Sequence, residues 1–116
     1  MDEAKRNQLI EDYYTGIDTA DADLLRGAFT EDILHEHPVR TVEGLDAFLE
    51  FKTVDQRDAG IRHEVIRRIH TPDASVVQGR VVARTEEAPV QVEFCDVFEF
   101  TADDSAVEKL SVYARE

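Results

Sequence analysis

The sequence predicts an α+β fold in which three helices and a short strand precede a curved, mostly antiparallel sheet. Apolar residues recur at helical spacing through most of the first 60 residues. From residue 61 onward the spacing becomes that of alternating strands, separated by segments rich in turn-forming residues. Helices first and strands afterwards indicate one helical layer packed on one sheet. With 116 residues the chain can bury one core, so we expect a single domain over residues 1–116.

The helices follow from apolar periodicity and from capping residues. Residues 3–18 form an amphipathic pattern whose apolar positions are Leu9, Ile10, Tyr13 and Ile17. Asp21 is a suitable N-cap for a second helix. The apolar face of that helix consists of Leu24, Leu25, Ala28 and Phe29. Gly44 begins a third helix, which directs Leu45, Phe48 and Leu49 inward.

The strands follow from a two-residue period. The segment from Ile33 to His37 alternates and stops at Pro38, which predicts a short strand at a sheet edge with His35 and His37 on the same side. A meander of four strands is then predicted at residues 61–70, 75–85, 90–100 and 106–115. Gly79 and Ala83 on the second of these are small enough to leave room for a cavity or for close approach of another segment.

The strand over residues 90–100 carries one polar residue on its apolar face. Asp96 shares that face with Val90, Val92, Phe94, Phe98 and Phe100. An ionised carboxylate there loses several kcal/mol of hydration unless it is protonated, paired, hydrogen-bonded or facing a pocket. Asp96 is therefore the first candidate for a functional residue, the alternative being a structural ion pair with an arginine.

Composition excludes several classes of partner. Twenty-six acidic and thirteen basic residues give a net charge of −13, which disfavours nucleic acids and anionic membranes. No apolar segment is long enough to span a bilayer, and no secretory leader is visible, so we expect a cytoplasmic protein. The single cysteine, Cys95, excludes an intrachain disulfide. The acidic surface, with ten Arg and three Lys, is also consistent with a salt-rich cytoplasm.

The order of elements, with the segments F-T-E-D-I-L-H-E-H-P and V-E-F-C-D-V-F-E-F, resembles the nuclear-transport-factor-two-like superfamily and, within it, the SnoaL-like group. The resemblance implies a cystatin-like half-barrel with a ligand cavity between sheet and helices, and a homodimer formed through the outer sheet face. Members include ketosteroid isomerases, polyketide cyclases and dehydratases, as well as proteins that only bind or scaffold. The expected partner is a small apolar molecule, bound without a cofactor.

Similarity to ketosteroid isomerase implies a catalytic set of Tyr13, His37 and Asp96. Tyr13 and Asp96 fall at the oxyanion-hole positions of that enzyme, for which a neutral Asp in an apolar site is a known arrangement. His37 departs from the pattern, because it stands where the isomerase has an aspartate base. Two assignments remain open: His37 as base with Tyr13 and protonated Asp96 as donors, or ionised Asp96 as base with His37 as acid. We expect the cavity to be lined by His35, Phe94, Phe98, Val92 and Phe29.

Other assignments compete with this one. His35, His37 and Asp96 together fit a two-His, one-carboxylate metal site, but two histidines on one strand are a weak signal and we expect no metal. Arg80 or Arg84 would hold Asp96 ionised if either reached the cavity.

The second class of function is non-catalytic. The cavity would then hold an apolar ligand non-catalytically, or the sheet face with Val97 and Val112 would form a dimeric scaffold, with Cys95 in a packing role.

Overall fold

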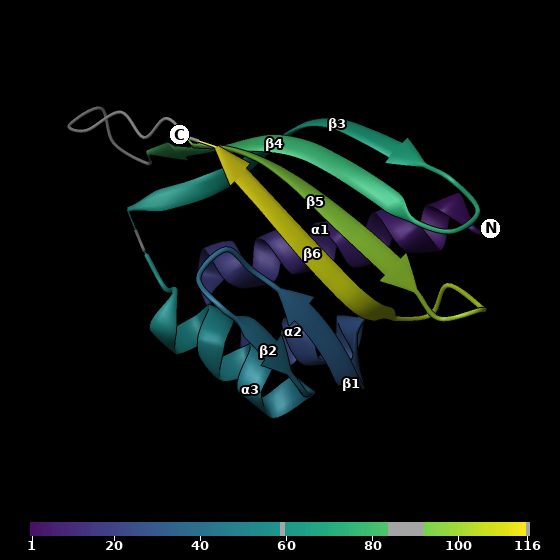
Figure 1. Cartoon of the computed structure of the whole chain (residues 1–116), viewed down its shortest axis with the longest axis horizontal. Helices are drawn as coiled ribbons and strands as arrows, with labels where there is room; N and C mark the ends of the chain where they lie inside the picture. Colours follow the sequence, from purple (N-terminus) through teal and green to yellow (C-terminus); the bar gives the residue numbers. More distant parts are fainter. Residues whose placement is uncertain (59, 84–91, 116) are drawn as a thin grey trace.

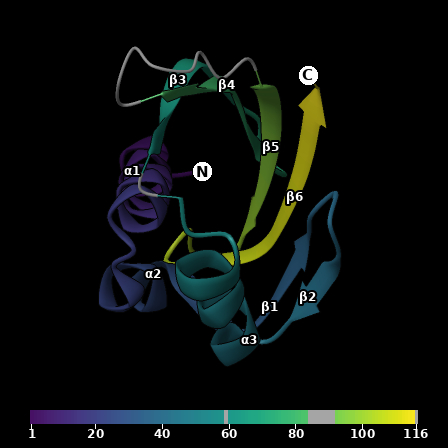
Figure 2. The ribbon, with the colours of Figure 1, turned by 90° about the vertical axis from the view of Figure 1, so that its left-hand side faces the viewer.

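The fold is a curved sheet that wraps around a group of helices. A computed structural model describes residues 1–58, 60–83 and 92–115, and within these residues there are three α-helices and a six-stranded sheet that does not close into a barrel. Seen end on, the sheet bends around an interior with the long helix on the open side and the two short helices below it (Figure 2). The predicted α+β class with a curved sheet is confirmed.

The helices begin where the sequence places capping residues. Helix α1 spans Glu3–Thr19, and the Asp2 side chain accepts a hydrogen bond from the backbone N–H of Lys5 at its start. Helix α2 spans Ala22–Ala28 and is capped in the same way by Asp21. It is shorter than predicted, because Phe29 is already extended and begins the first strand.

Helix α3 begins after Gly44, whose φ of 93° lies in the region that favours glycine. It covers Leu45–Glu50 and continues as one π-helical turn, η1, over Phe51–Asp55. Single π-helical turns within helices are uncommon and are frequent at functional sites.

The sheet contains β1 (Phe29–Glu36), β2 (Thr41–Glu43), β3 (Ile61–His70), β4 (Ser75–Ala83), β5 (Val92–Phe100) and β6 (Val107–Arg115), in the order β2-β1-β6-β5-β4-β3. Strands β3 to β6 form the predicted antiparallel meander (Figure 1). Strand β1 is longer than predicted and is parallel to β6.

One prediction about the sheet edge is wrong. Pro38 does not place β1 at the edge, because the chain turns there and returns as β2, which pairs with β1 on its outer side. The predicted strand ends at residues 84–85 and 90–91, and the turn at 86–89, lie outside the described residues.

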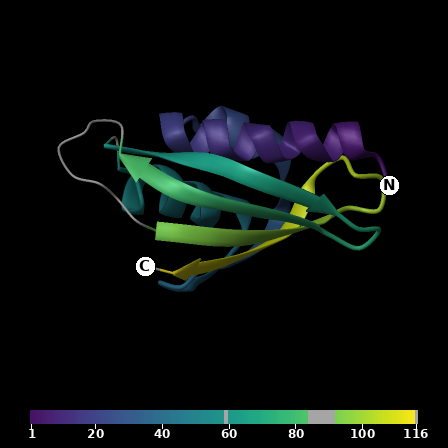
Figure 3. The same ribbon diagram turned by 90° about the horizontal axis from the view of Figure 1, so that it is seen from above.

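The two ends of the sheet are held differently. At the end near the N-terminus, buried Arg6 of α1 donates to the Asp104 carboxylate and to the backbone oxygens of Thr71 and Pro72. It thereby links α1 to the β3–β4 and β5–β6 turns, which lie beside it in Figure 3. The described arginines at the opposite end, Arg62, Arg80 and Arg115, are exposed and form ion pairs at the surface.

Phe94 packs closely against β4. A Cβ added to Gly79 would lie 2.4 Å from the Phe94 ring and 2.6 Å from the backbone oxygen of Glu64. Gly79 therefore permits close approach of its neighbours, which was one of the two alternatives for this position.

None of the helices in the described part of the chain is long and apolar enough to cross a lipid bilayer.

Candidate active site

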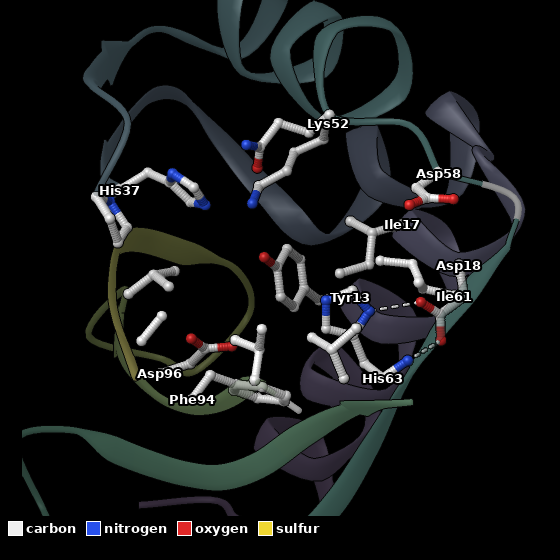
Figure 4. A pocket seen from close by; sticks show the side chains of 16 residues that line it. Tyr13, Ile17, Asp18, His37, Lys52, Asp58, Ile61, His63, Phe94 and Asp96 are labelled. Carbon is white, nitrogen blue, oxygen red and sulfur yellow. Dashed lines mark hydrogen bonds and ion pairs between the residues drawn. The ribbon is translucent and has the colours of Figure 1, made fainter. Parts of the chain in front are cut away.

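A cavity of about 350 Å³ lies between the inner face of the sheet and the helices. Its walls come from α1, η1, β3 to β6 and the segment after β1. Figure 4 shows its polar side chains, with Lys52 and His37 on one side and Asp96 and His63 on the other. A cavity of this size is within the range of small-molecule sites.

Asp96 is buried on the wall of this cavity, with 3% of its surface exposed. The Tyr14 hydroxyl donates a hydrogen bond of 2.6 Å to its Oδ2, whereas Oδ1 is buried without a partner among the described residues. Burial raises the pKa of Asp96 to about 6, although the Tyr14 hydrogen bond and the nearby Lys52 and His63 act in the opposite direction. Asp96 thus titrates near neutral pH, as a catalytic acid or base requires.

Tyr13 lines the cavity and directs its hydroxyl toward the centre (Figure 4). Its ring is held edge-on by Tyr14, Phe29 and Phe98. Burial, with the nearby Asp96 charge, raises the pKa of Tyr13 well above its ordinary value, so the phenol remains protonated and can donate a hydrogen bond. It is Tyr14, however, that contacts Asp96.

His37 lies on the opposite side of the cavity. The backbone N–H of Val39 donates to its Nδ1 at 3.1 Å, so the neutral ring carries its proton on Nε2. Burial lowers the pKa of His37 to about 4, with a further contribution from the charge of Lys52. His37 is therefore neutral at pH 7 and is arranged as a hydrogen-bond donor rather than as a base.

Lys52 reaches into the cavity from η1 (Figure 4) and is 6% exposed. Its ammonium group has no hydrogen-bond or ion-pair partner among the described residues, and it lies 5.6 Å from the ring centre of Tyr13 and 5.5 Å from that of Phe51. Burial lowers the pKa of Lys52 to about 8, while the charge of Asp96 raises it. An unpaired buried lysine is rare in proteins.

His63 pairs with Asp18. The Nδ1 atom of His63 lies 2.6 Å from Asp18 Oδ1, and the backbone N–H of His63 donates to Oδ2 at 3.0 Å. A carboxylate at Nδ1 keeps the proton on that nitrogen and leaves Nε2 of the neutral ring as an acceptor. The two imidazoles that line the cavity therefore differ in the partner of Nδ1, which is a carboxylate for His63 and a backbone N–H for His37.

The structure brings together some of the predicted site residues and not others. Tyr13, His37, Asp96, Phe94 and Val92 all line the cavity. His35, Phe98 and Phe29 do not, because their side chains are buried in the packed core.

His35 is packed in the core. Its Nδ1 bonds the backbone oxygen of Leu110 at 3.0 Å, and its ring packs against Phe48 and Phe51. Burial lowers its pKa to about 3. Within the described residues no group of three or more His, Cys, Asp or Glu side chains is placed to hold a metal ion.

The outer face of the sheet differs from the inner face. Arg80 is exposed there and pairs with Glu64 at 2.7 Å, so it does not reach Asp96, and Arg84 lies outside the described residues. Cys95 is half-buried on this face, but Val112, which was expected beside it, lines the cavity instead. The predicted homodimer through this face stays a prediction.

Sequence reasoning missed four residues of the site. Tyr14 follows Ile10 by four residues and Lys52 follows Leu45 by seven, so helical periodicity places both on inward faces. Periodicity alone did not single them out, because tyrosine packs readily in a core and lysine is usually assigned to the surface. Asp18 and His63 are 45 residues apart, and no local pattern relates them.

Comparisons with known proteins agree with this architecture. The sequence model of the SnoaL-like domain matches residues 10–109. No protein of curated function matches the sequence.

Solved structures show the same fold at low sequence identity. A candidate polyketide cyclase from Sinorhizobium meliloti has a TM-score of 0.74 at 20% identity, covering 90% of this chain and 93% of its own. A candidate ketosteroid isomerase from Kribbella flavida has a TM-score of 0.78 at 15% identity, with coverages of 97% and 79%. A protein of unknown function with a cystatin-like fold from Methylobium petroleophilum has a TM-score of 0.83 at 11% identity, with coverages of 100% and 79%. These likenesses confirm the predicted cystatin-like architecture.

Proposed function

Because this chain belongs to the SnoaL-like domain family, we propose that it binds a small apolar carbonyl compound in the cavity and catalyses proton transfer at the carbon next to the carbonyl group. The family suggests small-molecule binding, and isomerase and cyclase chemistry both begin with such a transfer. The observation that carries the proposal is Asp96, a buried carboxylate on the cavity wall with one oxygen held by Tyr14 and the other unpaired.

The protonation states favour Asp96 as the base. Above pH 6 its carboxyl is ionised, whereas the lowered pKa of His37 makes that imidazole a weaker proton acceptor. The bond between Val39 N–H and His37 Nδ1 also leaves only a donor at Nε2. Of the two assignments left open by the sequence, the geometry therefore supports the one with ionised Asp96 as base.

The other polar groups of the cavity are suited to stabilise the negative charge that forms on the carbonyl oxygen. When Asp96 takes the proton, the electrons of the C–H bond form a carbon–carbon double bond and negative charge develops on the carbonyl oxygen. Tyr13 and His37 present an O–H and an N–H to the cavity, and Lys52 adds positive charge. Donors that are fixed in a site with little water typically contribute about 3 kcal/mol each to such a transition state.

The test is deuterium incorporation from D₂O into 4-phenylcyclohexanone and a panel of related apolar ketones, followed by mass spectrometry. Asp96→Asn keeps the shape of the side chain and an acceptor for Tyr14, but it cannot accept a proton. We expect it to lower the exchange rate at least 100-fold, since general bases typically contribute 10²–10⁴-fold. Binding of the same ketone, measured by calorimetry, should change less than about tenfold, because most of the contact area is unaltered.

Cys95→Ser is the matched control, because Cys95 lies on the same strand but faces outward. It should leave exchange unchanged. Exchange that is equally fast in Asp96→Asn would disprove the role of Asp96. Tight binding of the ketones without exchange in the wild-type protein would instead support the second class of function, a non-catalytic binding protein.

A further inference from the structure

The proton transfer proposed above uses the positive charge of Lys52 but not the nucleophilicity of its amine. It sits on the π-helical turn η1 and is one of only three lysines in the chain. Its neighbours in the cavity are the Tyr13 ring and, beside it in Figure 4, His37. The described residues supply no carboxylate within ion-pair distance. Retaining an unpaired ammonium group in such a position costs free energy of folding, so a structural role is a poor account of it.

The other two lysines have the solvent-accessible positions that are usual for this residue type. Lys109 is about one-third exposed and lies 3.8 Å from both Glu36 and Glu99. Lys5 is exposed on the first turn of α1. Lys5 is solvated and Lys109 is partly solvated and paired with two carboxylates, whereas Lys52 is buried and has no such partner among the described residues. The chain thus contains two internal references for the reactivity of Lys52.

We infer that Lys52 is a covalent binding site for aldehydes and ketones, in which its ε-amine forms an imine with the carbonyl carbon of a ligand held in the cavity. Lysines that react in this way are typically those that an apolar pocket keeps partly unprotonated. Burial, which lowers the pKa of Lys52 to about 8, supplies that condition. The cavity supplies the second condition, a site where a carbonyl compound lies beside the amine.

Imine formation proceeds in two balanced steps. The lone pair of the neutral amine attacks the carbonyl carbon, and a proton passes from nitrogen to oxygen to give a carbinolamine. The hydroxyl group then leaves as water when it is protonated by a buffer acid from the solvent. The nitrogen electrons form the C=N bond, so the net reaction is amine plus carbonyl giving imine plus water, with no oxidant or reductant.

This inference rests on the proposed function only for the class of ligand. A protonated imine would make the adjacent C–H more acidic and so assist its removal by Asp96. Imine formation itself needs no proton removal from carbon, however. A probe without such a carbon-bound proton therefore tests Lys52 separately from the proposed catalysis.

The experiment uses the full chain at pH 7.5 with benzaldehyde and sodium cyanoborohydride, which reduces an imine irreversibly to a benzylamine. Peptide mapping by mass spectrometry then gives the rate of benzylation at each amine. We expect Lys52 to be labelled at least about tenfold faster than Lys5 and Lys109, because a larger fraction of its amine is unprotonated. Lys52→Arg should lose only this label, and 4-phenylcyclohexanone should slow it by competition.

The variants separate this inference from the proposed function. Asp96→Asn should still be labelled at Lys52, even though it no longer exchanges deuterium. Labelling confined to Lys5, Lys109 and the N-terminal amine would overturn the inference while leaving the role of Asp96 intact. The wild-type map alone decides this point, so the result does not depend on whether Lys52→Arg folds.

Discussion

The two sides of the cavity differ in whether their buried polar groups have side-chain partners. On the side formed by α1, β3 and β5, two polar groups have a side-chain partner: Asp96 accepts a hydrogen bond from Tyr14 through Oδ2, and His63 is paired with Asp18. We call this the paired wall, and it comprises Tyr14, Asp18, His63 and Asp96. The facing side, the unpaired wall, comprises His37 and Lys52, which have no hydrogen-bonding or ion-pairing side chain among the described residues.

This difference indicates which polar groups stabilise the fold and which are available to bind a ligand. The hydrogen bond or ion pair of a paired group stabilises the free protein, so removing its partner should cost stability. An unpaired group stays in an unfavourable state, as the lowered pKa values of His37 and Lys52 indicate. Its removal should therefore preserve or increase stability, as is common where function and stability conflict. Three substitutions test this contrast.

Lys52→Met should have the largest effect, a gain in stability. Because the pKa of Lys52 is lowered in the folded protein, the unfolded chain binds more protons between about pH 8 and 10.5, and the full penalty is present at pH 7. Removing the charge should raise the free energy of unfolding at pH 7 by about 2 kcal/mol, part of the gain being lost because Asp96 no longer benefits from the nearby charge. Urea denaturation measures this change.

Lys109→Met is the control for that experiment. Its surface ion pairs with Glu36 and Glu99 contribute little, so the free energy of unfolding should change by less than about 0.5 kcal/mol. The gain from Lys52→Met should also shrink as the pH rises past 8. A loss of stability in Lys52→Met would mean that Lys52 supports the fold.

Asp18→Ala should lower stability by about 2 kcal/mol, because it leaves the ring and the backbone N–H of His63 without their acceptor. Asp12→Ala on the same helix is the matched control, since it removes only a hydrogen bond from the exposed Gln8 side chain and should cost less than about 0.5 kcal/mol. Thermal and urea unfolding give both values. Equal effects of the two substitutions would contradict the distinction between the walls.

His37 should give the smallest effect on stability and a clear spectroscopic one. Since burial lowers its pKa to about 4, its ring protons in NMR spectra should show the neutral form down to about pH 5. A lowered folded-state pKa means that the contribution of His37 to stability is complete above pH 6.5 and is lost as the pH falls toward 4. Because the ring is partly solvated, we expect this loss to be under about 1 kcal/mol and to vanish in His37→Gln. Titration near pH 6.5 would show that the ring is not desolvated.

The sequence by itself determined the architecture and the direction in which Asp96 points. Helices and strands depend on patterns with periods of two to four residues, and these patterns are explicit in the chain. The capping residues Asp21 and Gly44 fixed where two helices begin. The same local alternation placed Asp96 among inward-facing apolar residues of β5.

Only the tertiary structure decided which groups Asp96 meets. Tyr14 is 82 residues away from Asp96, and Asp18 is 45 residues from His63, so these pairs depend on how α1 docks against a curved sheet. His35 and His37 share one side of their segment, yet one is buried against α3 and η1 and the other reaches the cavity, because β1 ends between them. Periodicity reports which face a residue occupies, but sheet curvature and helix docking decide whether that face meets packed side chains or open space.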